Sequence, residues 1–474
     1  MISLTNCSRL PARNAVAARF MSSLPIRSRG PLVGIVGSGP SAFYTAYRLL
    51  QKNPDTRIDM YERRPVPFGL VRYGVAPDHP EVKNVQNKFA EVANYPHFRF
   101  VGNVHVGKDV KLKTLAQNYD CLVLAYGASG DRVLGIPGED LSGVLSARQI
   151  VGWYNGLPEC QDVNLAMDKV RDVVIVGQGN VSLDVARMLM TPPDKLAHTD
   201  ASPRFLDAMR NSTIKRITLV GRRSIEHLPC TLKELRELFA IENAAYNPFT
   251  IHPVDWDKVM KQKFDRARKR LLTFLYSKQE TKSEETAGAI VWGFENELTP
   301  AQVLGDGNRA ASSIRFHDNR PSSQQDKAFH ELPAQLIIRS IGYKSEPLDG
   351  LETVGTHFDL KKNVIRNENG RAAAGIYTSG WLKNGPIGVI AVTMMDAFGT
   401  ADKILKDWET GTSFLENSGR GWQAIEHELQ HPYVTWDDWK KIELHEKTGG
   451  QRRGSHSAKF LSWEDALKAI GKLE

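Results

Sequence analysis

Two stretches of the chain repeat one pattern of apolar and polar positions, about 140 residues apart. In each, an uninterrupted apolar run leads into a glycine-rich turn, and small and apolar residues at helical spacing follow. The runs begin at Leu32 and Val173, and a second apolar strand comes after each helix, at residues 57–62 and 217–223. The repeated pattern predicts two β-α-β units, each in a largely parallel sheet covered by helices.

Two further apolar runs indicate how these units are joined. Residues 120–128 and 335–343 each have the pattern of a buried parallel strand that ends in a glycine turn, and Pro- and Gly-containing sequence follows each. We therefore predict an α/β fold with two Rossmann-like dinucleotide-binding domains, the second inserted into the first. The first domain comprises residues 31–126 and 346–474, and the inserted domain comprises residues 127–345.

Three other segments carry the signals of loops. Residues 63–83 contain four prolines and two glycines, which predicts an ordered loop without helix or strand. The apolar residues of this loop indicate packing, either against a flavin ring or against the core. Residues 192–213 and 277–330 contain polar stretches rich in Pro, Ser and Asp, and we expect these to be surface insertions.

The small residues of the two glycine turns suit a bound pyrophosphate. Glycine lets the backbone approach the phosphates at a helix N-terminus, where unpaired amides favour anions. The residues expected to bind the first nucleotide are Gly37, Gly39, Pro40 and Ala42. In the second turn Gly177 and Gly179 take the same places, and Ser182 stands at the third small position.

The strands that follow the two turns end in opposite charges. Glu62 closes the first strand, and a carboxylate there accepts hydrogen bonds from a ribose diol, which favours FAD. Arg222 and Arg223 close the second, and paired guanidinium groups suit the 2′-phosphate that distinguishes NADP(H) from NAD(H). A chain that holds both nucleotides is expected to transfer hydride.

A third glycine-rich segment adds a further candidate contact to the flavin. Residues 373–390 predict a strand, a turn and a helix that begins near Gly388, whose amide end is expected to face the flavin ring. Trp381 lies in this segment, and the flanking glycines favour a place beside the ring over a place in the core.

Charge and composition narrow the class of protein. An apolar fraction of 41% with no run of about 18 apolar residues is typical of a soluble protein without a transmembrane segment. Five of the eight net positive charges lie in residues 1–30, which contain Arg, Ser and Ala but no acid. This segment predicts a mitochondrial transit peptide, with a disordered basic tail as the alternative.

The four cysteines do not form a recognisable cofactor motif. Cys7, Cys121, Cys160 and Cys230 are scattered, so we expect neither a redox-active dithiol nor an iron–sulfur cluster, and no metal site is predicted. Electrons that leave the flavin must then go to an acceptor outside the protein.

A basic run at residues 258–270 is a candidate contact surface for such an acceptor. Arg266 and Arg270 are four residues apart and share a face if the run is helical. The run is either a docking surface for an acidic partner or a solvated helix face. Nucleic acid is not expected, because no aromatic residues or reading module accompany the charges.

Together these motifs resemble the adrenodoxin reductase type of ferredoxin–NADP⁺ reductase, within the glutathione-reductase-like flavoproteins. The resemblance extends in order over nearly the whole chain after residue 30. Its most specific part is residues 67–83 within a matching stretch at 66–83, and this part is more specific than the glycine motifs. The other matching segments are 37–40, 61–62, 177–187, 221–223 and 379–381.

The resemblance implies an enzyme that passes electrons from NADPH through FAD to an acidic mitochondrial [2Fe–2S] ferredoxin. It implies FAD contacts at Glu62, Leu70, Val106, Trp381, Gly388, Val389 and Ile390. It implies NADP contacts at Gln178, Asn180, Val181, Arg222, Arg223 and Glu234, with Trp381 and Gly388 facing both ligands. His79 and Asp184 match a proposed proton relay near the flavin, with a core or supporting role as the alternative, and Arg266 and Arg270 match ferredoxin-docking arginines.

We expect a protein of the mitochondrial matrix and a monomer, although the sequence leaves the oligomeric state and peripheral contact with the inner membrane open. The ferredoxin would serve iron–sulfur cluster assembly, haem modification or cytochrome P450 systems. Two other functions stay open at this point: an NADPH-dependent flavin monooxygenase and a non-enzymatic FAD-binding protein.

Overall fold

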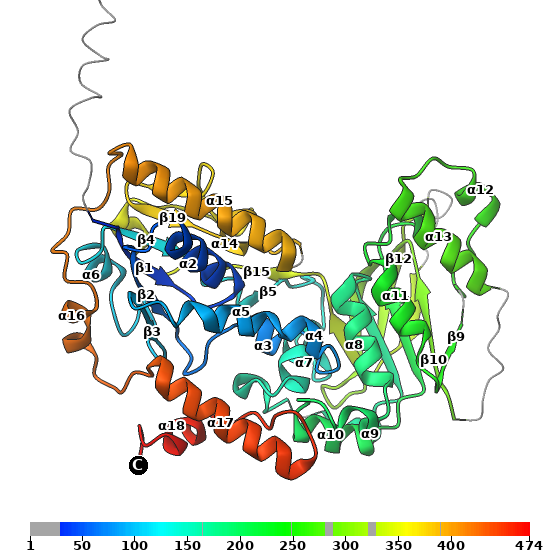
Figure 1. Ribbon diagram of the computed structural model, residues 1–474. Helices are drawn as coiled ribbons and strands as arrows, with labels where there is room; N and C mark the ends of the chain where they lie inside the picture. Colours follow the sequence, from blue (N-terminus) through cyan, green and yellow to red (C-terminus); the bar gives the residue numbers. More distant parts are fainter. Residues whose placement is uncertain (1–28, 164, 248, 280–287, 321–328, 389) are drawn as a thin grey trace, which may run out of the picture.

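The computed structural model describes residues 29–474 apart from 164, 248, 280–287, 321–328 and 389. The predicted transit peptide therefore lies outside the described residues, except for its last two. Two lobes, each built on a six-stranded sheet, lie side by side (Figure 1). None of the helices in the described part of the chain combines the length and apolar character that crossing a bilayer requires.

The first sheet contains the first glycine turn. Its order is β18 (Arg371–Ala373), β19 (Ile376–Thr378), β4 (Cys121–Leu124), β1 (Leu32–Val36), β2 (Arg57–Tyr61) and β3 (Phe98–Val101). All neighbours pair in parallel except β18 with β19. Helices α2 (Pro40–Lys52) and α15 (Ile390–Glu409) pack against each other beside this sheet, so segments from both ends of the chain complete one lobe (Figure 1).

The second sheet contains the second glycine turn and is entirely parallel. Its order is β6 (Val144–Ser146), β14 (Leu336–Arg339), β7 (Asp172–Val176), β8 (Arg216–Val220), β10 (Ile290–Glu295) and β9 (Ala244–Tyr246). The predicted α/β class with two Rossmann-like units is confirmed. The near-continuous Val, Ile and Leu of the central strands fit a sheet that is buried on both faces.

The prediction of surface insertions was wrong for much of two segments. Residues 290–295 form β10 inside the second sheet, where the side chains of Trp292 and Phe294 are fully buried. After it, β11 (Leu298–Gly305), β12 (Ala311–Asp318) and β13 (Phe329–Pro333) form an antiparallel sheet. In the other segment, α10 (Pro203–Arg210) buries Phe205 against Trp153. Polar residues on the exposed faces concealed these buried positions.

The chain passes between the lobes through a two-stranded ribbon. β5 (Gly130–Asp131) leaves the first lobe and β15 (Tyr343–Lys344) returns to it, and the two pair antiparallel. The ribbon lies next to the expected domain limits at 126/127 and 345/346. Those limits stay a prediction, which this pairing supports.

Residues 63–83 contain two single-turn helices that the sequence did not predict: α3 (Leu70–Tyr73) and α4 (Pro80–Lys83). Glycines flank α3, and Pro80 begins α4, where its missing amide hydrogen costs nothing. Phe68 has a positive φ of 82° and packs at 5.3–6.1 Å from the rings of Phe43, Phe89, Trp436 and Trp439. The surrounding aromatic rings hold this backbone conformation, which is unfavourable for a residue with a Cβ.

Helix α17 (Trp436–Arg453) runs beneath both lobes in Figure 1, and α18 (Trp463–Ala469) packs against it. Glu446 of α17 pairs with the buried Arg72 of α3. Lys459, which follows α17, pairs with Asp200 of the second lobe, and Asp200 also pairs with Lys83 of α4. Buried charges thus join the residue 66–83 segment, the C-terminal segment and the second lobe.

Candidate cofactor cleft and active site

The first glycine turn has the geometry of a phosphate cradle. Gly37 has a φ of 104°, and a Cβ there would stand 2.5 Å from the carbonyl oxygen of Ala125, so no larger residue fits. Gly39 is the N-cap of α2, and a Cβ there would meet no atom within 4 Å. The turn therefore presents open space at a helix N-terminus, which is what a dinucleotide pyrophosphate requires.

Glu62 is fixed beside this turn. Its Oε2 accepts hydrogen bonds from the backbone nitrogen of Ser38 at 3.1 Å and from the Ser38 hydroxyl at 2.7 Å, and Oε1 accepts one from the nitrogen of Arg64 at 3.1 Å. Oε2 thus has both lone pairs occupied, whereas Oε1 accepts one hydrogen bond and has a second lone pair available. The side chain is therefore preorganised to accept a ribose hydroxyl.

A cavity of about 590 Å³ runs from this turn to the second lobe. Its walls include most of the cofactor contacts expected from the sequence: Gly37, Gly39, Pro40, Glu62, Leu70, Val106, Val181, Glu234, Trp381, Gly388 and Ile390. Val389 is outside the described residues. Ala42 was expected to bind the cofactor, but it is fully buried and does not line the cavity, because its methyl group packs into the core under α2.

Trp381 is the first residue of the short helix α14 (Trp381–Asn384), and only Ser379 and Gly380 separate it from β19. Its ring stacks on that of Tyr343, with centroids 5.5 Å apart and an interplanar angle of 26°. Both rings line the cavity. Burial raises the pKa of the Tyr343 hydroxyl.

Several residues of the cavity wall were missed by the sequence analysis. Residues 126–129 line it directly after β4, and Tyr343, Arg148 and Lys233 reach it from the second lobe. A signal was available for the first group, because ligands bind beyond the carboxyl ends of parallel strands and β4 was predicted to end there. No local pattern marks the other three, which the interlobe arrangement brings to the site.

The second glycine turn repeats the geometry of the first. Gly177 has a φ of 128°, and a Cβ there would lie 2.2 Å from the carbonyl oxygen of Ser340. Gly179 is the N-cap of α8 (Asn180–Met190), and a Cβ there would meet open space. This turn can therefore hold a second pyrophosphate at a helix N-terminus.

Two side chains expected to contact NADP have partners within the protein. The Gln178 amide nitrogen donates to the carbonyls of Leu219 and Glu295 and to Asn296 Oδ1, at 2.8–3.1 Å, and the side chain is buried. Asn180 Oδ1 accepts a hydrogen bond from the nitrogen of Thr231 at 2.9 Å. Gln178 thus fastens the turn to the ends of β8 and β10, which leaves its backbone for the nucleotide.

Arg222 and Arg223 follow β8 after Gly221, and both are exposed. Neither guanidinium forms an ion pair with any acid among the described residues. Their backbones are held, because Asn319 Nδ2 donates to the carbonyl of Arg222 at 2.8 Å and the nitrogen of Glu297 donates to that of Arg223 at 3.3 Å. The loop presents two cations at the expected place of a 2′-phosphate.

His79 and Asp184 have different nearest partners. His79 Nε2 lies 3.1 Å from Glu237 Oε2. Asp184 accepts a hydrogen bond from Arg187 Nη2 at 3.0 Å, and the other Arg187 nitrogen pairs with Asp78. Burial raises the pKa of Asp184, although Arg187 and the nearby His79 oppose this shift. Neither residue lines the cavity, so any role in proton transfer requires an intermediary.

The basic run contains two helices, α12 (Trp256–Met260) and α13 (Arg266–Gln279). Arg266 and Arg270 lie in the first turns of α13 and are both exposed. Arg268 between them donates to the carbonyl of Leu228, so it is used within the protein. The expected pair therefore shares an exposed helix face on the second lobe.

Comparisons with known proteins agree with this geometry. A family model described as pyridine nucleotide-disulphide oxidoreductase matches residues 32–224. A probable mitochondrial NADPH:adrenodoxin oxidoreductase of Schizosaccharomyces pombe is 51% identical over 94% of this chain and 96% of its own. The chain belongs to the NADPH:adrenodoxin oxidoreductase family. The human member, also named as mitochondrial, is 41% identical over 98% of this chain and 96% of its own.

The chain is also similar to a solved bacterial structure. Mycobacterium tuberculosis FprA, solved in complex with NADPH, is 34% identical, with a TM-score of 0.83 over 93% of this chain and all of FprA. The resemblance to adrenodoxin reductases is therefore confirmed, together with the class of FAD- and NADP(H)-dependent oxidoreductase. The site residues themselves stay predictions.

Proposed function

We propose that this chain oxidises NADPH and delivers the electrons singly to an acidic [2Fe–2S] ferredoxin. The observation that carries the proposal is that one cavity is lined by both nucleotide units. Gly37 and Glu62 reach it from the first lobe, and Val181 and Glu234 reach it from α8 and α11 (Leu232–Phe239) of the second. A nicotinamide and a flavin bound to these units would therefore meet in one enclosed space.

The first unit fits FAD. Glu62 would hold the ribose, the amide end of α2 would hold the pyrophosphate, and Trp381 stacked on Tyr343 would limit the ring end of the cavity. Bound there, FAD accepts a hydride from a nicotinamide and releases single electrons. The protein supplies position and exclusion of water.

The second unit fits NADPH. The turn from Gly177 to Gly179 would take the pyrophosphate, and Arg222 and Arg223 would take the 2′-phosphate. The open guanidinium groups match a dianionic phosphate, which an exposed arginine pair binds in a bidentate manner. We infer a strong preference for NADPH over NADH.

His79 and Asp184 would manage a proton near the two nucleotides. Burial raises the pKa of Asp184, with Arg187 and His79 nearby, and a carboxyl group with a raised pKa is suited to exchanging a proton. Their supporting role in holding α8 to the residue 66–83 segment, through Arg187 and Asp78, is the structural alternative.

Arg266 and Arg270 would contact the ferredoxin. They are exposed and close together on α13, and complementary charge speeds encounter with an acidic partner. We place the protein in the mitochondrial matrix as a monomer, with residues 1–30 as transit peptide, and infer no contact with nucleic acid. Peripheral contact with the inner membrane is a secondary proposal.

The deciding experiment mixes the purified protein, NADPH, a mitochondrial ferredoxin and cytochrome c. We expect reduction of cytochrome c that depends on the ferredoxin and saturates with it. Steady NADPH oxidation without any acceptor protein would indicate a monooxygenase instead. FAD binding without turnover of NADPH or ferredoxin would indicate a non-enzymatic flavoprotein.

A further inference from the structure

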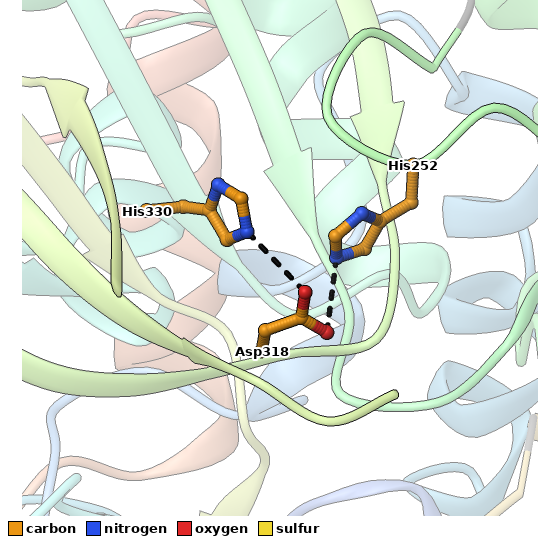
Figure 2. Close-up of side chains that lie close together, drawn as sticks. All are labelled: His252, Asp318 and His330. Atoms are coloured by element: carbon orange, nitrogen blue, oxygen red, sulfur yellow. Dashed lines mark hydrogen bonds and ion pairs between the residues drawn. The ribbon is translucent and has the colours of Figure 1, made fainter. Parts of the chain in front are cut away.

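Three side chains in the second lobe converge away from the cofactor cavity. Figure 2 shows His252, Asp318 and His330 pointing toward one another. His252 Nε2 lies 3.4 Å from Asp318 Oδ1, and His330 Nε2 lies 3.4 Å from Asp318 Oδ2. If each residue offers one nitrogen or oxygen as a ligand, the three ligand atoms all lie within 4.8 Å of one another.

The register of β12 and β13 explains why Asp318 and His330 lie on the same face of their sheet. His330 of β13 pairs with Phe316 of β12, and Asp318 is two residues further along β12. Since side chains alternate along a strand, Asp318 and His330 point to one side of the sheet and His317 points to the other. His252 comes from the loop after β9 and covers the first side.

His252 is buried without satisfying its polar atoms. Its side chain is only 3% exposed, and neither ring nitrogen has a hydrogen-bond partner of good geometry among the described residues. Leaving a buried imidazole in this state costs free energy unless a further group binds to it. Its Nε2 is the atom that faces Asp318.

Arg320 also contacts Asp318, with Nη2 2.9 Å from Oδ2. It approaches from the solvent side, where its own side chain is 39% exposed. Arg320 contacts both oxygens, because its backbone nitrogen donates to Oδ1 at 2.9 Å and its Nε lies 3.3 Å from each oxygen. Each oxygen of Asp318 therefore has Arg320 on one side and an imidazole on the other.

We propose that His252, Asp318 and His330 bind one divalent transition-metal ion of the Zn²⁺ type, with water at a fourth position. Two imidazoles and a carboxylate are typical ligands for such ions, whereas Mg²⁺ and Ca²⁺ prefer oxygen alone. Bonds of about 2.0–2.1 Å at tetrahedral angles put ligand atoms about 3.3 Å apart. Each imidazole nitrogen lies 3.4 Å from one of the two Asp318 oxygens, and one atom from each residue lies within 4.8 Å of the others, so small side-chain shifts would bring the three onto one ion. His330, with 30% of its side chain exposed, leaves a route for the ion and for water. The scattered sequence positions explain why no metal site was predicted.

The site would also stabilise the loop that carries Arg222. Asn319, next to Asp318, donates to the carbonyl of Arg222, and residues 250 and 251, next to His252, donate to Glu295 at the end of β10. A metal ion bound to both His252 and Asp318 would link the segment at 250–252 to the segment at 318–319. This consequence for NADPH affinity rests on the proposed function, whereas metal binding itself does not.

The test titrates Zn²⁺ into the untagged, FAD-loaded protein against a chromophoric chelator, without NADPH, and records the visible spectrum with Co²⁺ as a second probe. We expect one ion per chain. His252→Ala and His330→Ala should each weaken binding by more than the roughly 10–100-fold that loss of an outer-shell partner costs. His317 lies on β12 next to Asp318 but points to the opposite face of the sheet, so His317→Ala should bind Zn²⁺ as the parent does. Flavin absorbance and circular dichroism check that each variant is folded.

Three outcomes would overturn the proposal. The parent could bind no Zn²⁺, or His252→Ala and His330→Ala could bind Zn²⁺ as tightly as the parent does. His317→Ala could also lose as much affinity as those two variants, which would indicate an adventitious surface ion only. If the site binds metal, chelation should raise the KM for NADPH in the parent without changing kcat, and should have no effect in His252→Ala. An unchanged KM in the parent would overturn only the link to Arg222.

Discussion

Arg72 and Glu446 are 374 residues apart in sequence, and Arg72 Nη2 lies 2.5 Å from Glu446 Oε1. Their side chains are 7% and 2% exposed. The Arg72 guanidinium also lies over the rings of Tyr73 and Trp439, and Glu446 accepts a hydrogen bond from the nitrogen of Phe460. The pair thus fixes the C-terminal helix α17 to the segment that lines the cofactor cavity.

Glu446→Ala should therefore destabilise the protein strongly. Removing one member of a buried pair leaves the other charge without compensation, which costs about 3–5 kcal/mol. Urea unfolding followed by circular dichroism measures the change. The matched control is Glu91→Ala, which removes an exposed pair with Lys88 and should cost less than about 1 kcal/mol. Similar losses in both variants would show that the buried pair has no special role.

Lys459 gives a prediction for the pH dependence of stability. Burial outweighs the attraction of Asp200 and lowers the pKa of Lys459 to about 7. Between that value and the ordinary lysine range near 10.4, the unfolded chain binds this proton more tightly than the folded one. Stability from this group should therefore rise with pH through that window.

Thermal unfolding at several values between pH 7 and 9 tests this sign. The parent should gain stability with pH relative to Lys459→Met, which keeps the length and burial of the side chain but cannot titrate. Asp200 retains Lys83 as a partner in this variant. Parallel pH profiles for the two proteins would contradict the lowered pKa.

The sequence predicted the parts of the fold that local pattern determines. The turns at Gly37 and Gly177 need φ angles of 104° and 128° and leave no room for a Cβ, so glycine marks them directly. The sequence also predicted that Glu62 and Arg222 lie near a bound ribose. In a β-α-β unit the second strand ends beside the glycine turn that follows the first strand.

The remaining features depend on contacts between distant segments. Ala42 occupies the place of a third glycine, but its methyl group faces the core. Tyr343 reaches Trp381 only because the interlobe ribbon returns there, and His252 meets Asp318 only through the fold of the second lobe. No periodicity or spacing in the sequence indicates these contacts between distant residues, so the sequence analysis could not predict them.

Glu62→Gln should weaken FAD binding. The amide keeps the size of the side chain but loses the negative charge and one acceptor, and hydrogen bonds to charged groups contribute about 1.5–3 kcal/mol each. Flavin release, followed by fluorescence during dilution, should show about tenfold to hundredfold weaker retention. Glu81→Gln, at an exposed position of α4 that does not line the cavity, is the control and should retain FAD as the parent does. Equal retention in Glu62→Gln would remove Glu62 from the cofactor site.

Replacing Arg222 and Arg223 together by Ala should abolish the preference for NADPH. Each lost charge-assisted contact to the 2′-phosphate should lower kcat/KM for NADPH by about tenfold to hundredfold, while NADH, which lacks that phosphate, should change little. The control is Arg216→Ala, an exposed arginine at the other end of β8. An unchanged NADPH/NADH ratio in the double variant would refute the assignment.

Reversing the charge of Arg266 and Arg270 should impair only the step that involves the ferredoxin. We expect Arg266→Glu/Arg270→Glu to lower kcat/KM for ferredoxin and to reduce its dependence on ionic strength, because complementary charge acts mainly on encounter. Reduction of ferricyanide, a small acceptor that needs no docking surface, should proceed at the parent rate.

The control variant is Lys269→Glu, which reverses one charge, half the change of the double variant, at an exposed position of the same helix and leaves both arginines in place. If Lys269→Glu lowered the ferredoxin rate as much per charge, the effect would come from the net charge of the lobe. A normal and equally salt-sensitive rate in the double variant would leave this face of α13 as an ordinary solvated surface.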